Sequence, residues 1–171
     1  GDPEDAVCGD EVDGDVFEPA AVLESFISLL VAVEAEGVSR NSFHCNWSSP
    51  IAAAVGGKTL VVFGGGDGVL YAFEPVARAS SGVAKLRAVW KYDCNPKQYR
   101  FKPDGTKAQY SAHNKRIPTG PSEVIAIPTV ADGRIYVAIG QSPLHGKGQG
   151  MLNCVDARSG RRIWASPKVD R

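Results

Sequence analysis

Apolar residues recur at alternate positions in three stretches of the chain. The stretches are "SLLVAVEAEG" (28–37), "GVLYAFEPVA" (68–77) and "GMLNCVDARSG" (150–160), and each reaches an acidic residue, Glu34, Glu74 or Asp156. Alternation with a period of two is typical of a β-strand that buries one face. The pattern therefore predicts a strand in each stretch, running from Phe26 to Val33 in the first.

A second pattern comes before two of these strands. "SSPIAAAVGGKTLVVFGG" (48–65) parallels "AIPTVADGRIYVAIG" (126–140), and each copy closes later with a tryptophan, in "RAVW" and in "GRRIW". Each unit thus consists of four antiparallel strands, the last ending in Trp. The acidic residues lie 40 and 82 positions apart, and a period near 40 residues with four strands is typical of β-propeller blades. The predicted fold is all-β, with antiparallel four-stranded blades of a partial propeller.

The glycine-rich segment "VVFGGGDGVLYAF" (61–73) could be a phosphate-binding loop or a hairpin turn. A phosphate-binding loop must lead into a helix, whose N-terminal amides hold the anion. Here the glycines lead into an alternating strand, and Asp67-Gly68 is typical of a hairpin turn. We predict a hairpin turn here, and an enlarged turn at "HGKGQG" (145–150).

Two regions outside the strands complete the predicted organisation. Residues 1–25 form an acidic, poorly ordered lead-in, with eight acidic and no basic residues among the first 18. Residues 26–171 form the partial propeller, interrupted by a long basic loop at 94–123 that holds four prolines. Residues 18–36 also allow a helix, with Val22, Phe26, Leu30 and Val33 on one face; the similarity to the other two stretches favours the strand.

Charge and hydropathy restrict the classes of function. The chain has 19 basic and 19 acidic residues, which argues against a general nucleic-acid binder. Its most apolar run, Phe26 to Val33, is shorter than the roughly 20 residues of a membrane span. The acidic N-terminus does not fit a signal peptide. The chain is therefore cytosolic, or its targeting segment was removed or never included.

The cysteines and histidines form no recognisable motif. Four widely separated cysteines indicate structural thiols or one disulfide, with pairing left open: Cys8, Cys45, Cys94 and Cys154. A metal site at His44 and Cys45 would be incomplete, and a hydrolase based on His44, His113 or His145 lacks an accompanying motif. We assign no catalytic, cofactor-binding or metal-binding residue.

The repeats resemble the PQQ-like (pyrroloquinoline-quinone-like) β-propeller repeat family. The fullest copy is "PTVADGRIYVAIG…GMLNCVDARSGRRIW" (128–164), and a looser copy runs from 49 to 90. The resemblance covers roughly residues 26 to 166. It implies structural roles, in turns and between blades, for six residues: Trp90, Trp164, Asp67, Gly68, Asp156 and Gly160.

By this resemblance, the chain is expected to be a non-catalytic scaffold or binding module of an extracytoplasmic, periplasmic bacterial type. Two to three blades cannot close a ring, which indicates a fragment of a larger propeller or a self-associating chain. A protein partner is expected, with a glycan or small-molecule ligand also open. The candidate interaction surface lies in the basic loop, where basic and aromatic residues mix, together with one histidine: Tyr99, Arg100, Phe101, Lys102, Lys107, Tyr110 and His145, with Lys115 and Arg116 nearby.

The alternative that the family allows is part of a quinoprotein dehydrogenase. Such an enzyme uses PQQ as electron acceptor and a calcium ion as Lewis acid. Its adjacent cysteine pair is missing from this sequence, and none of its calcium ligands can be matched. Under this alternative, the active-site residues lie mostly outside the chain.

Overall fold

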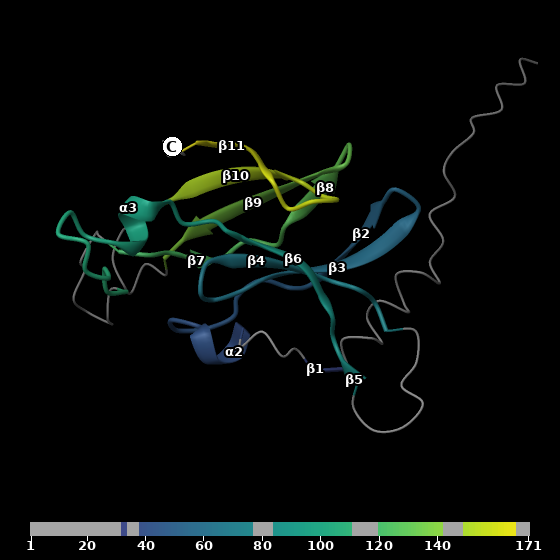
Figure 1. The fold of residues 1–171 in the computed structure, drawn as a ribbon, viewed down its shortest axis with the longest axis horizontal. Helices are drawn as coiled ribbons and strands as arrows, with labels where there is room; N and C mark the ends of the chain where they lie inside the picture. Colours follow the sequence, from purple (N-terminus) through teal and green to yellow (C-terminus); the bar gives the residue numbers. More distant parts are fainter. Residues whose placement is uncertain (1–31, 34–37, 77–83, 111–119, 142–148, 167–171) are drawn as a thin grey trace, which may run out of the picture.

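A computed structural model describes residues 32–33, 38–76, 84–110, 120–141 and 149–166. The described part is built mainly from two antiparallel sheets (Figure 1). The first sheet has the order β2-β3-β4-β6, with β2 Ile51–Val55, β3 Lys58–Gly64, β4 Val69–Phe73 and β6 Ala88–Asp93. It is the four-stranded antiparallel blade that the sequence predicts.

The second sheet repeats this plan with one added strand. Its order is β11-β10-β9, and β7 and β8 pair with different halves of β9. The bounds are β7 Glu123–Val124, β8 Thr129–Ala131, β9 Arg134–Gly140, β10 Met151–Asp156 and β11 Arg162–Ser166. The all-β prediction of antiparallel blades in a partial propeller is confirmed. The tryptophans lie inside β6 and β11 and do not end them, because pairing with β4 and β10 continues beyond each indole.

The core lies between the two sheets, which Figure 1 shows stacked one above the other. Alternate residues of β9 enter it, Ile135, Val137 and Ile139, and the first sheet contributes Leu70 and Val62. These side chains are at most 3 % exposed, so this interface carries most of the apolar burial in the described part. A second, smaller core lies on the far face of the first sheet, where α2 (Val38–Asn41) packs.

The glycine-rich turn joins β3 to β4, and no helix follows it. Gly68 has a φ of +76°, a conformation that glycine adopts freely. An added Cβ there would lie 2.1 Å from Asn95 Nδ2 and 2.2 Å from the Ser122 carbonyl oxygen. The hairpin interpretation is confirmed, and space as well as φ requires glycine at this position.

Other predictions from the sequence agree with the structure only in part. Of the predicted strand at 26–33, only β1 (Ala32–Val33) is described, and it pairs parallel with β5 (Ala84–Lys85) instead of adding an antiparallel blade strand. The expected loop at 94–123 begins with a helical turn, α3 (Lys97–Arg100), and ends in β7. Residues 1–25 and 145–148 lie outside the described residues. No helix among those described is long and apolar enough to cross a membrane.

Candidate functional site

Trp90 joins the two sheets. Its indole N–H donates a hydrogen bond to the carbonyl oxygen of Ala157, 3.1 Å away in the turn that follows β10. Gly160 closes that turn at a φ of +67°, and a Cβ added there would lie 2.6 Å from the Trp90 ring. The ring therefore rests against a glycine that leaves room for it, and the indole satisfies a backbone carbonyl.

The turn that receives Trp90 is held by Asp156. Its carboxylate accepts hydrogen bonds from the Ser159 backbone N–H at 2.8 Å and the Ser159 hydroxyl at 2.6 Å. These bonds hold the pKa of Asp156 below its ordinary value, because they favour the charged form. The sequence "DARSG" therefore forms a preorganised turn, which presents the Ala157 carbonyl to the indole.

Tyr92, two residues after Trp90, makes a second polar contact between the sheets. Its hydroxyl donates to Asn153 Oδ1 at 2.9 Å, and Asn153 Nδ2 donates to the Cys94 carbonyl oxygen at 3.3 Å. Asn153 has no exposed surface, so these bonds satisfy a polar side chain inside the core. Burial raises the pKa of Tyr92 to about 12.

Trp164 occupies in the second sheet the place that Trp90 has in the first. Trp90 pairs with Ala72 of β4, and Trp164 pairs with Cys154 of β10. Trp164 is 38 % exposed, and its ring lies beside Tyr136, with centroids 6.1 Å apart. We call this surface the outer face; its half-buried or exposed residues alternate with those of the core: Tyr136, Ala138, Leu152 and Trp164.

A buried carboxylate lies at the other end of the second sheet. Glu123 has no exposed surface and accepts three hydrogen bonds: from the Cys45 backbone N–H at 3.1 Å, Trp47 Nε1–H at 3.2 Å and the Tyr110 hydroxyl at 2.8 Å. Burial raises the pKa of Tyr110, and the contact with Glu123 raises it further. Glu123 thus ties two distant segments to β7, a role that could not be predicted from the sequence because no local motif marks it.

The basic and aromatic residues predicted as an interaction surface separate into two groups. Phe101, Lys102 and Lys107 are exposed on a short hairpin, where Phe101 and Lys107 form a bridge. Tyr99 is buried against the core, and its hydroxyl reaches the Gly150 carbonyl oxygen at 3.5 Å.

The other predicted surface residues are engaged in the fold or lie outside the described part. Arg100 binds the Asp93 carboxylate and donates to the Asp67 carbonyl oxygen at 2.8 Å. Tyr110 binds Glu123 and stacks on Phe43, with centroids 5.1 Å apart. His145, Lys115 and Arg116 lie outside the described residues. Among the described residues of the predicted surface, Phe101, Lys102 and Lys107 are the exposed ones.

Asp67 has a structural place in the first hairpin. Its carboxylate accepts hydrogen bonds from the Val69 backbone N–H at 3.0 Å and from the Tyr71 hydroxyl at 2.6 Å. Burial raises the pKa of Asp67, although these hydrogen bonds oppose the shift. Within the described residues Cys45, Cys94 and Cys154 are free thiols, and no cluster of three or more potential metal ligands occurs. Cys8 lies outside that part.

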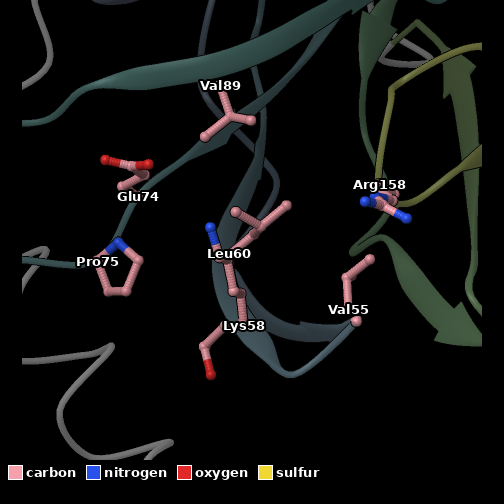
Figure 2. Close-up of a pocket in the computed structure, with 9 residues that line it drawn as sticks. Val55, Lys58, Leu60, Glu74, Pro75, Val89 and Arg158 are labelled. Atoms are coloured by element: carbon pink, nitrogen blue, oxygen red, sulfur yellow. The ribbon is translucent and has the colours of Figure 1, made fainter.

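A groove opens where the two sheets meet near the β2–β3 turn (Figure 2). Its volume is about 520 Å³. Figure 2 shows Val55, Lys58 and Leu60 of the first sheet in its wall, with Arg158 of the second sheet facing them. It is lined by apolar and charged side chains in similar measure, which suits an amphipathic occupant better than a purely apolar one.

No protein-family model and no curated protein matches this sequence. Two solved structures to which the chain is similar are a europium-containing methanol dehydrogenase and BamB from Moraxella catarrhalis. The first has a TM-score of 0.36 and 14 % identity over 78 % of this chain and 17 % of the dehydrogenase. The second has a TM-score of 0.27 and 12 % identity over 80 % of this chain and 40 % of BamB. The chain thus spans less than half of either protein.

Proposed function

We propose that this chain is a non-catalytic, propeller-type scaffold or binding module that acts outside the cytoplasm, and that its outer face binds a protein surface. The observation that carries the proposal is the contrast between two equivalent tryptophans. Trp90 is hydrogen-bonded into the next sheet, and Trp164 is 38 % exposed beside Tyr136. An aromatic pair that includes an exposed tryptophan is typical of the centre of a protein interface.

The first partner to test is a second copy of this chain. An open blade leaves an apolar face and a strand edge, β11, whose outward hydrogen-bonding groups can pair with another chain. Ile163, 46 % exposed, enlarges the apolar surface of that edge strand. Burying both against a second copy removes this surface from water and satisfies the edge.

Light scattering coupled to size exclusion tests the proposal on the full chain. We expect a mass above 18.1 kDa that rises with concentration, and a return to monomer in Trp164→Ser. Val89→Ser, an exposed residue of the first sheet, serves as control and should leave the mass unchanged. A monomeric wild type with no partner captured through the outer face would overturn the proposal.

The dehydrogenase alternative is tested separately. The chain is titrated with PQQ and calcium, and quinone absorbance is followed on adding an alcohol or a sugar. Quinone binding at micromolar affinity with substrate-dependent reduction would replace the scaffold proposal. We expect no spectral change.

A further inference from the structure

We propose that the groove between the two sheets binds the acidic N-terminal segment of this same chain, residues 10–17. This inference goes beyond the proposed function and does not depend on it, since it concerns a different surface. The groove lies at the β2–β3 turn, whereas the outer face lies on β9, β10 and β11.

The groove has a net positive charge. Its ionisable lining groups are Lys58, Glu74 and Arg158. Glu74 is paired with Arg87, which donates to its carboxylate from both Nε and Nη2. Glu74 is thereby neutralised, and the lining leaves the positive charges of Lys58 and Arg158 on opposite walls (Figure 2). Such a site favours an occupant with spaced carboxylates.

The groove also has an apolar lining. The apolar residues that line the groove are Val55, Leu60, Pro75 and Val89, and Val89 is 41 % exposed. A free carboxylate would leave these side chains in water. An extended peptide that alternates acidic and apolar residues would cover them while its carboxylates meet Lys58 and Arg158.

The acidic N-terminal segment has this chemistry. "DEVDGDVF" (10–17) places four carboxylates among Val12, Val16 and Phe17, and residues 1–18 contain no lysine or arginine. It is therefore complementary to the groove in both charge and apolar content.

The attachment of the segment puts the groove within its reach. β1 at Ala32–Val33 is paired with β5, and β5 leads within five residues to Val89 in the groove wall. Fourteen residues, 18–31, separate Phe17 from Ala32, and this stretch can span up to roughly 50 Å. Five residues span at most about 18 Å. Tethering of this kind gives an effective concentration of about a millimolar, at which even weak pairing is populated.

Disulfide trapping tests the assignment on the full chain. In a Cys8→Ser, Cys45→Ser background, Val12→Cys is combined with Val89→Cys in the groove or with Gln98→Cys on α3. Gln98 is the matched control because it is exposed, and in the sequence it lies next to Lys97 and shortly before the hairpin lysines Lys102 and Lys107. We expect the Val12–Val89 crosslink to form at least about tenfold faster, and to slow about tenfold when Lys58→Glu and Arg158→Glu are added or when salt reaches about 1 M.

Circular dichroism confirms folding, and a second pair, Val16→Cys with Thr59→Cys, provides an independent readout if the first variant is unfolded. Equal crosslinking rates at Val89 and Gln98, or faster crosslinking at Gln98, would overturn the proposal in favour of nonspecific attraction to the basic hairpin. Crosslinked dimers in place of crosslinked monomers would overturn the intramolecular assignment. Failure of this test leaves the mass and partner experiments on the outer face unaffected, so the two proposals are separable.

Discussion

Trp90 and Trp164 share a motif and a strand position but differ in environment. Trp90 donates to the Ala157 carbonyl and rests on Gly160, while Trp164 is 38 % exposed. Two residues later, Tyr92 crosses to Asn153, whereas Ser166 holds the equivalent place in β11. The first sheet thus has a complete interface with its neighbour, and the second presents the same kind of face with nothing described against it.

This difference shows that the contribution of a repeat residue to stability depends on its neighbour. An indole lowers the free energy of folding when it displaces water from a partner surface and satisfies a polar group. The same indole on an unpartnered face contributes less to the fold and becomes available for binding. Matched substitutions in the two sheets can measure the difference.

The largest contrast is expected between two leucines at equivalent positions, Leu70 and Leu152. Leu70 has no exposed surface and lies in the core, so Leu70→Ala should cost about 2–5 kcal/mol in unfolding free energy. Leu152 is half-buried on the outer face, and Leu152→Ala should cost about 1 kcal/mol or less. Urea denaturation measures both, and equal costs would show that the outer face is packed as tightly as the interface.

The next largest difference in stability is expected between Gly160→Ala and its control, Gly133→Ala. Both glycines have a φ of +67°, so both alanines carry about 1–2 kcal/mol of backbone strain. Only at Gly160 does the new Cβ meet the Trp90 ring, which adds about 1–3 kcal/mol of overpacking; Gly133 has nothing within 4 Å. If thermal unfolding shows equal losses, Trp90 does not rest on this turn as described.

Trp90→Phe should have an intermediate effect. It removes the indole N–H and leaves the Ala157 carbonyl without that donor, at a cost of about 1–3 kcal/mol. Trp164→Phe keeps an aromatic ring on an exposed face and should change stability by about 0.5 kcal/mol or less in dilute solution. If Trp164→Phe loses more stability at high protein concentration than in dilute solution, a second copy of the chain binds the outer face. This result would sharpen the comparison between the two tryptophans.

The smallest effect is expected from the titration of Tyr92. Its folded-state pKa of about 12 lies above the ordinary value near 10, so its stabilising contribution is present below pH 10 and is lost as the pH rises towards 12. Because the side chain is half-buried, solvent screening limits the loss to about 1 kcal/mol. The loss in unfolding free energy between pH 9 and pH 11.5 should be smaller for Tyr92→Phe than for the wild type. An equal loss in the two proteins would contradict the assignment.

The strands and turns could be predicted from the sequence because they depend on local patterns. Alternation marks β4, β9 and β10, and Asp67-Gly68 marks the turn. The buried carboxylate of Glu123 could not be predicted, since its three donors lie up to 78 positions away. Tyr99 and Phe101 have similar sequence surroundings, yet one is buried and the other exposed, because Tyr99 lies in the helical turn α3 and Phe101 follows it in an extended conformation on the short hairpin.

The amino-acid sequence by itself determined the all-β architecture, the four-stranded unit and the presence of a tryptophan in its last strand, because strand periodicity and turn chemistry act over a few residues. Only the tertiary structure decided which tryptophan is satisfied, which aromatic residues of the basic loop reach the surface, and where two cations from different sheets flank one groove. These properties arise from contacts between segments far apart in the chain, and local sequence carries no record of them.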